Sequence, residues 1–243
     1  MLEVERHEKI LKELEKKGRL SYKEIEVFLM VSIATIRRDV EKLKEEGLLE
    51  KVSGGVLSRR KMSFESGVSE KFYINIDEKK IIAKKAAKLV KNGDFIYMDA
   101  GTTVYYMIQY LGGKEITVVT NGLMHLEALI SQNINTIITG GEIKPSTRAV
   151  VGSEALKNVE KYRFDKCFMG TNGLNMHYGY MTPDINEANM KRTVIEISNE
   201  AYILADSQKF GELSSIKFAD LEQCKIITGN RIVADYSKFP ILD

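Results

Sequence analysis

Short apolar runs alternate with helical segments from Asp77 to the end of this chain of 243 residues. The runs are rich in β-branched and aromatic residues and lie at 95–98, 116–119, 136–138, 166–169, 202–204 and 225–227. Segments with apolar residues at helical spacing lie between them, at 81–90, 104–111, 123–131, 154–159 and 187–199. Buried parallel strands have this appearance, and helices cover both faces of such sheets. We therefore predict an open, mostly parallel α/β sheet over residues 77–243.

Polar, glycine-rich residues follow five of these runs. The candidates are Asp99, Gly101, Thr102, Thr103, Asn121, Gly141, Thr171, Asn172 and Lys209. The carboxyl ends of parallel strands meet at one edge of the sheet, where ligands of such folds bind. A glycine after a strand is most often only a turn. Five such ends together favour a site for a small anion, most simply a phosphate ester, and Thr102 and Thr103 open a helix whose N-terminus favours an anion.

The segment 32–43 reads as a helix suited to the major groove of DNA. Ser32 is its expected N-cap, and the residues expected to face inward are Ile33, Ile36, Val40 and Leu43. The opposite side then presents Ala34, Thr35, Arg37, Arg38 and Glu41. An arginine fork can bond both acceptors of one guanine edge, and short side chains allow close approach. Taken alone, the helix equally fits a surface helix with solvated charges.

The flanking segments favour the DNA-binding interpretation. A helix with apolar residues at helical spacing runs from Arg6 and ends at Gly18, and a second one runs from Ser21 to about Phe28. After Gly47, the residues 48–52 and 56–57 flank a Ser-Gly-Gly turn and predict a two-stranded wing. This is the order of elements in a winged helix-turn-helix.

Two sets of motifs resemble the DeoR family of bacterial transcriptional regulators. The first set is Arg6-x3-Ile10-x3-Leu14, Ser32-x2-Thr35-Ile36-Arg37-Arg38-Asp39-Val40, Gly47-Leu48-Leu49 and Gly54-Gly55. The second set resembles the sugar-phosphate-sensing domain of these regulators: Asp99-x-Gly101-Thr102-Thr103, the Thr-Val-Val-Thr-Asn run that ends at Asn121, Gly140-Gly141, Glu187-Ala188 and Asp206-x2-Lys209-Phe210. That domain is similar in fold to ribose-5-phosphate isomerases and CoA transferases.

The resemblance implies roles for individual residues. Thr102, Thr103 and Lys209 would hold the phosphate, and Asp99 and Asn121 would contact sugar hydroxyls. Glu187 is a further effector-binding candidate, although its spacing from Lys191 is more often that of a helix-surface ion pair. The candidate DNA-binding residues are Ser32, Ala34, Thr35, Arg37, Arg38 and Lys51.

The overall charge and the cysteines set limits on these interpretations. The formal net charge is only +2, so DNA binding must rest on a local patch. Such a patch would comprise Arg37, Arg38, Lys42, Lys44, Lys51 and the basic residues 59–61.

Cys167 and Cys224 stand apart from each other and from the histidines, so we predict neither a disulfide framework nor a metal site, and no cofactor. A signal peptide and a membrane span are not evident, so we expect a cytoplasmic protein.

The predicted organisation is a winged helix-turn-helix at 1–57, a linker at 58–76 with room for a short helix, and an effector-sensing α/β domain at 77–243. We predict a transcriptional repressor of a sugar uptake or catabolism operon, released from operator DNA by a phosphorylated sugar. Fructose 1-phosphate is favoured by the resemblance alone. A two-fold operator requires a homodimer or homotetramer.

The alternative is a sugar-phosphate isomerase with Asp99 or Glu187 as base and Lys209 as electrostatic stabiliser, but such an enzyme has no use for the first 57 residues.

Overall fold

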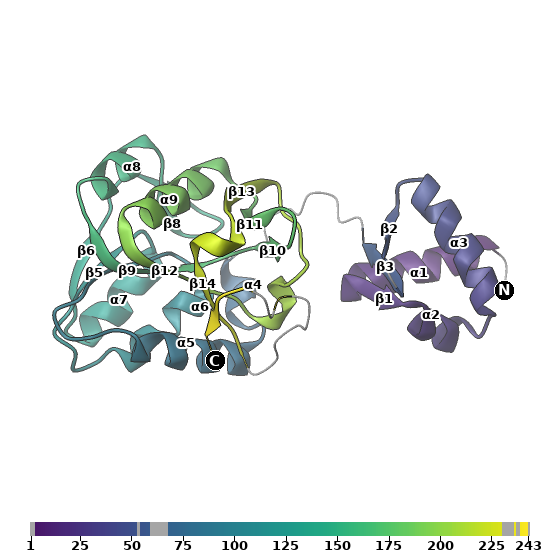
Figure 1. The fold of residues 1–243 in the computed structure, drawn as a ribbon, viewed down its shortest axis with the longest axis horizontal. Helices are drawn as coiled ribbons and strands as arrows, with labels where there is room; N and C mark the ends of the chain where they lie inside the picture. Colours follow the sequence, from purple (N-terminus) through teal and green to yellow (C-terminus); the bar gives the residue numbers. More distant parts are fainter. Residues whose placement is uncertain (1–2, 53, 59–67, 230–235, 237–238, 243) are drawn as a thin grey trace. The chain divides into compact units, whose positions relative to one another are not determined.

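The computed structural model describes residues 3–52, 54–58, 68–229, 236 and 239–242, and the chain divides into two compact units, Met1–Phe64 and Glu65–Asp243 (Figure 1). Among the described residues, no helix is long and apolar enough to cross a membrane. Cys167 and Cys224 are free and buried.

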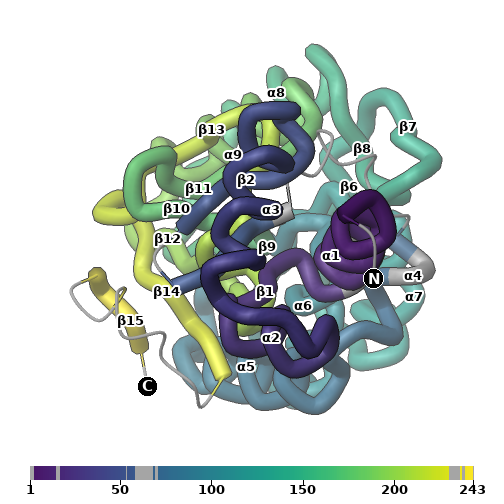
Figure 2. Tube along the Cα trace, turned by 90° about the vertical axis from the view of Figure 1, so that its right-hand side faces the viewer, coloured from purple at the N-terminus to yellow at the C-terminus, as the bar shows by residue number. Residues whose placement is uncertain are grey.

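Among its described residues, the N-terminal unit contains three helices and a three-stranded antiparallel sheet; α1, α2 and α3 are labelled in Figure 2. Its elements are α1 (Glu3–Lys17), β1 (Arg19–Ser21), α2 (Tyr22–Leu29), α3 (Ile33–Glu45), β2 (Leu49–Val52) and β3 (Gly55–Ser58). The strand order is β1-β3-β2, so the predicted two-stranded wing is extended by a strand that the sequence did not suggest. The core consists of Ile10, Leu14, Leu20, Ile25, Leu29, Ile36, Val40, Leu43, Leu49 and Val56.

Local signals set the boundaries of these helices. Gly18, with φ of +73°, ends α1, because glycine adopts this left-handed conformation without steric cost. Ser21 and Glu24 form a capping box at α2: the Ser21 hydroxyl accepts from Glu24 N at 3.1 Å, and the Glu24 carboxylate accepts from Ser21 N at 2.8 Å. One expectation is wrong, because Ile33 is 40% exposed. Side chains lean toward the helix N-terminus, so this first-turn residue lies beyond the edge of the core.

The C-terminal unit is built on a seven-stranded sheet of order β15-β14-β12-β9-β4-β5-β6. Its strands are β4 (Phe95–Met98), β5 (Thr117–Thr120), β6 (Asn135–Ile138), β9 (Phe164–Gly170), β12 (Ser198–Leu204), β14 (Lys225–Ile227) and β15 (Ile241–Leu242). All neighbouring strands pair in parallel. The predicted parallel sheet is confirmed, although β15 was not anticipated.

Helices cover both faces of this sheet (Figure 1). The helices are α4 (Val68–Phe72), α5 (Ile76–Lys88), α6 (Thr102–Tyr105), α7 (Leu123–Ser131), α8 (Ser153–Val159) and α9 (Ile185–Glu196). The apolar residues of α5, α6 and α7 pack with Ile96 and Met98, whereas those of α8 and α9 pack with Tyr97 and Cys167. Successive residues of a strand point to opposite faces, so β4 contributes side chains to the hydrophobic cores on both faces of the sheet.

Several elements were not predicted from the sequence. The hairpin of β7 (Glu142–Lys144) and β8 (Ala149–Val151) follows β6. A small antiparallel sheet contains β10 (Gly173–Asn175), β11 (Gly179–Thr182) and β13 (Ile216–Ala219). The segment expected as one helix at 104–111 is divided into α6 and a 3-10 turn at Ile108–Tyr110, and a second 3-10 turn occupies Ser207–Lys209. By contrast, the segment interpreted as a linker was given room for a short helix, and residues 68–72 form α4 there.

Candidate functional site

The exposed side of α3 carries the candidate DNA-binding residues. Ser32 is the N-cap: its hydroxyl accepts from Thr35 N at 3.3 Å and lies 3.0 Å from Thr35 Oγ1. Ala34, Arg37 and Arg38 are exposed, and Thr35 is half-buried. The side chains of Arg37 and Arg38 are therefore accessible on one helix, the arrangement that base and phosphate contacts require.

A buried ion pair holds this helix against α1. The Arg6 guanidinium donates to both carboxylate oxygens of Asp39, at 2.7 and 2.8 Å, and only 2% of Asp39 is exposed. Burial alone would raise the pKa of the Asp39 carboxyl, but the hydrogen bonds and charge of Arg6, aided by His7, hold that pKa below its usual value. This bidentate pair fixes the rotation of α3. Asp39 lies in one of the family motifs, but the sequence gives no sign of this contact with Arg6.

The wing lysine is linked to the same helix. Lys51 Nζ lies 2.6 Å from Glu41 Oε2, and Lys44 Nζ lies 3.4 Å from Glu41 Oε1. All three side chains are about half exposed, so these pairs are weak and can be exchanged for contacts with phosphate. Lys42 of the expected basic patch pairs with Glu3 at 2.7 Å, whereas residues 59–61 of that patch and the wing residue Ser53 lie outside the described residues.

The carboxyl edge of the seven-stranded sheet has its topological switch point between β4 and β9. From β4 the chain proceeds through β5 to β6, whereas β9 is followed on its other side by β12, β14 and β15. Asp99 follows β4, and Gly170 ends β9. The crevice beside such a switch point is where open α/β sheets bind ligands.

Asp99 organises this point. Its Oδ1 accepts from Gly101 N at 2.8 Å and its Oδ2 from Gly170 N at 3.0 Å. Its Oδ2 also pairs with the Lys191 ammonium, which donates to Gly170 O at 2.9 Å. Asp99 and Lys191 are both more than nine-tenths buried. The carboxylate and the ammonium therefore hold the two central strand ends together.

Most of the other predicted strand-end residues also have protein partners. Asn121 accepts from Ala100 N at 3.0 Å and donates to Val150 O at 3.1 Å. The Thr171 hydroxyl lies 2.6 Å from Gly173 O and 3.0 Å from Met181 O. A side chain on Gly141 would lie 2.7 Å from Val151 O. These three residues thus maintain the close packing of the loops around the edge.

Glu187 belongs to a different cluster from Lys191. Its Oε1 accepts from Thr147 Oγ1 at 2.9 Å and from Lys144 Nζ at 3.2 Å, while the Thr182 hydroxyl donates to its Oε2 at 3.3 Å. Glu187 and Lys191 are each buried with separate partners, so they do not form the helix-surface pair that their spacing suggested. Thr182 also lies 3.2 Å from Asn172 Oδ1, which brings Asn172 into this cluster.

A cationic cluster lies at the same edge, and its central residue was missed by sequence reasoning. Lys79 of α5 is only 3% exposed, donates to Thr102 Oγ1 at 3.0 Å and also donates to Lys71 O. Burial lowers its pKa to about 8; nearby Asp206 opposes this shift, and Lys209 and Lys71 add to it. Lys79 and Thr102 therefore meet at this edge, Lys209 is close enough to lower the pKa of Lys79, and Thr103, next to Thr102 in the chain, is likewise buried.

The sequence did contain a signal for Lys79. It stands at the helical spacing of the buried residues Ile82, Ala83, Ala86 and Ala87, in a position where an apolar residue is expected. A lysine in the buried stripe of a helix is costly unless it has partners. Such a lysine at a sheet edge is accordingly a candidate for anion binding.

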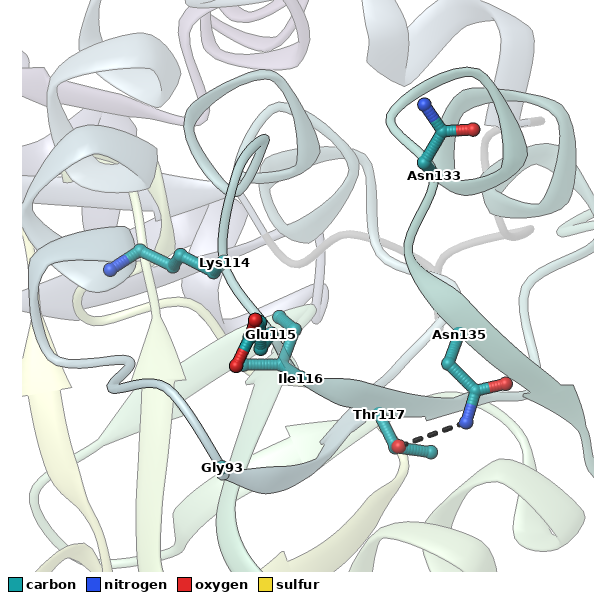
Figure 3. A pocket seen from close by; sticks show the side chains of 7 residues that line it. All are labelled: Gly93, Lys114, Glu115, Ile116, Thr117, Asn133 and Asn135. Carbon is teal, nitrogen blue, oxygen red and sulfur yellow. Dashed lines mark hydrogen bonds between the residues drawn. The ribbon is translucent and has the colours of Figure 1, made fainter.

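A separate depression of about 370 Å³ lies at the opposite edge of the sheet (Figure 3). It is lined by Gly93, Lys114, Glu115, Ile116, Thr117, Asn133 and Asn135, near the amino ends of β5 and β6. Lys114 Nζ donates to Val90 O at 2.7 Å, and Asn135 Nδ2 to Thr117 Oγ1 at 3.0 Å. The side chains of Lys114, Asn135 and Thr117 are thus engaged in structural bonds, and the cationic cluster at the carboxyl edge is the better candidate site.

Two family models match the chain: the DeoR-like helix-turn-helix domain over residues 6–61 and the DeoR C terminal sensor domain over residues 74–230. The uncharacterized HTH-type transcriptional regulator FruR of Bacillus subtilis is 42% identical over 94% of this chain and 91% of its own length. The lactose phosphotransferase system repressor of Staphylococcus aureus is 34% identical, with 96% and 92% covered. Ribose 5-phosphate isomerase A of Methanocaldococcus jannaschii matches with 19% identity and a TM-score of 0.42 over 56% of this chain and 55% of that chain.

Proposed function

Since this chain belongs to the DeoR family of helix-turn-helix transcriptional regulators, we propose that it is a sugar-operon repressor whose effector binds beside Lys79, Thr102 and Lys209. The observation that carries this proposal is the buried Lys79 ammonium next to a threonine hydroxyl and a second lysine, at the carboxyl edge of the sheet. A phosphate ester carries nearly two negative charges at neutral pH. Its burial requires donors and cations, which this cluster supplies.

The other strand-end residues have a supporting role in this proposal. Asp99 and Asn121 bind backbone groups and so hold Gly101 and the loop after β5 in position. The sugar would then lie against this preformed edge, and we propose Glu187, Thr182 and Asn172, which are hydrogen-bonded to one another there, as acceptors for its hydroxyls. Fructose 1-phosphate is the effector that we propose to test first, on family resemblance.

The alternative of a sugar-phosphate isomerase is not favoured. Family membership assigns the chain to transcriptional regulators. Asp99 and Glu187, the two carboxylates considered as bases, each accept from three protein donors. A base that is held in this way is poorly placed to take a proton from a substrate carbon. Purified protein is expected to leave ribose 5-phosphate and fructose 1-phosphate unchanged.

Lys209→Met and Thr102→Val provide the test of the effector site. Each variant is expected to bind operator DNA like the parent but to be released only at much higher fructose 1-phosphate concentrations, because a ligand shifts an equilibrium only through its differential affinity for the two states. A gel-shift titration with the effector measures this release. Lys80→Met, which changes an exposed lysine of α5, is the matched control. Normal release from both site variants would contradict the assignment.

For DNA recognition, we propose that Arg37 contacts a base and that Arg38 contacts phosphate. Arg37→Ala is expected to cost about 1–3 kcal/mol on the specific site and to relax base preference. Arg38→Ala should instead weaken binding to all sequences alike and reduce the salt slope by about one unit. Binding isotherms on operator and scrambled DNA at several salt concentrations distinguish the two roles. Identical behaviour of both variants on both DNAs would refute this division.

We further propose that the protein binds its operator as a homodimer or homotetramer, because one recognition helix reads only a half-site. Light scattering on the free and DNA-bound protein measures the mass directly. A monomer in both states would exclude this assembly without affecting the effector assignment.

A further inference from the structure

Helix α4 is the first described element after residues 59–67, which follow the wing strand β3 in the chain. It is docked on two parts of the C-terminal unit. Val68 N donates to Ser146 O in the β7–β8 hairpin at 2.8 Å, and Phe72 O accepts from the Tyr106 hydroxyl at 3.0 Å. The Phe72 ring also meets the Tyr105 ring edge-on, with centroids 4.9 Å apart.

A further contact joins α4 to the effector site. The Lys79 ammonium, which donates to Thr102 Oγ1, also donates to Lys71 O in the last turn of α4. The last carbonyls of a helix lack partners within the helix; Lys71 O accepts from the Lys79 ammonium and, at 3.4 Å, from Ile74 N. The buried Lys79 ammonium therefore contacts both Thr102, a residue proposed to bind the phosphate, and the end of α4, the helix that precedes the effector domain's sheet in the chain.

We propose that Lys79 couples the effector site to α4: an anion bound beside Thr102 draws the Lys79 ammonium away from Lys71 O and loosens the docking of α4. This inference rests on the proposed function of the site and adds the means by which its occupancy is transmitted.

The relative strengths of the two acceptors support this coupling. A hydrogen bond from an ammonium to a charged phosphate oxygen is about twice as strong as one to a neutral carbonyl. An ammonium has three donors, and Thr102 and Lys71 O use two of them. A phosphate group offers several acceptor oxygens, so when it accepts two hydrogen bonds from this ammonium, the neutral carbonyl of Lys71 is the partner that is displaced.

The length of α4 makes it sensitive to such a loss. A helix of five residues has no stability of its own, so α4 depends on its contacts with Ser146, Tyr106 and Lys79. When α4 leaves the C-terminal unit, its residues lengthen the chain segment between the two units. In an oligomer on a two-fold operator, a longer connection lowers the effective concentration of the second winged helix at its half-site. Release of α4 thus weakens operator binding.

Hydrogen exchange of the full-length protein tests the coupling. The amides of residues 68–72 are followed with and without saturating fructose 1-phosphate, and with inorganic phosphate as a second probe. We expect exchange in α4 to become about tenfold faster or more on binding, since local opening governs exchange. Binding, seen as a thermal shift, with unchanged or slower α4 exchange would overturn the coupling and leave the effector site standing. Absence of binding by either probe would remove the site and the coupling together.

Two tyrosines of the same region supply a matched pair of variants. Tyr106→Phe removes the hydroxyl that holds Phe72 O, while Tyr105→Phe removes a hydroxyl that forms no described bond with α4. Without effector, Tyr106→Phe is expected to weaken operator binding about 3- to 10-fold, the effect of one hydrogen bond. It should also tighten fructose 1-phosphate binding, because coupling is reciprocal. Tyr105→Phe should do neither. Wild-type operator affinity in Tyr106→Phe, or equal effects in both variants, would overturn the proposal.

Discussion

Lys79→Met is expected to lose its response to the effector and, because it removes one bond that holds α4, to bind operator DNA about 3- to 10-fold more weakly, as Tyr106→Phe does. Removing one partner of a buried, hydrogen-bonded charge pair costs about 2–5 kcal/mol, so the dissociation constant of the phosphorylated sugar should rise at least roughly 30-fold. The melting temperature should not fall, because the fold disfavours a charged group at this position, as the lowered pKa of Lys79 shows. Isothermal titration of the effector measures the loss, and Lys80→Met, which changes an exposed neighbour, is the control.

The pH dependence of effector binding distinguishes a direct charge contact from a structural effect. Lys79 has a pKa of about 8 in the effector-free protein, where burial, Lys209 and Lys71 lower the pKa and Asp206 raises it. An anion raises this pKa again, so above pH 8 binding must take up a proton. The dissociation constant should therefore rise by up to about tenfold per pH unit above pH 8. The phosphate is already a dianion above pH 8, so its own titration does not contribute to this rise. In Lys79→Met the dissociation constant should not rise with pH. If it rose equally in the parent and in Lys79→Met, the titrating group would not be Lys79.

Lys191→Met is expected to cause the largest loss of stability in the C-terminal unit. The side chains of Lys191 and Asp99 are only 10% and 5% exposed, and the substitution leaves the Asp99 carboxylate buried without its cation. Breaking a buried pair from one side costs about 3–5 kcal/mol, equivalent to a fall in melting temperature of about 6–20 °C. Calorimetry or urea unfolding followed by fluorescence of the tyrosines measures this change.

Two further variants test the cause of that loss. Asp99→Asn combined with Lys191→Met removes both charges and should recover part of the stability, because the single variant is penalised mainly for the unpaired charge. Lys157→Met breaks the pair with Glu154, in which both side chains are 66% exposed, and should change little. If Lys191→Met were as stable as Lys157→Met, Asp99 would have sufficient support from its two backbone donors, Gly101 N and Gly170 N.

At the candidate site, the sequence predicted the positions of the polar residues, whereas the tertiary structure determined their hydrogen-bond partners. Asp99, Asn121 and Thr171 were selected because polar residues follow buried strands, and the structure places them at that edge. Their partners are backbone groups such as Ala100 N and Met181 O, which the sequence did not reveal. Buried polar groups must be satisfied, but the partner that satisfies each of them is set by the packing of neighbouring loops.

The sequence by itself determined the order of the main helices and of six strands of the parallel sheet, and the starts of α2 and α3, because hydrophobic periodicity and helix caps act between residues close in the chain. It also indicated the edge of the sheet at which we propose that the effector binds. The tertiary structure alone decided that Lys79 reaches Thr102 and Lys71 O, that Asp99 pairs with Lys191, and that Arg6 holds Asp39. These contacts join residues on different elements, and their geometry depends on how whole helices pack on the sheet and on one another, which no local pattern encodes.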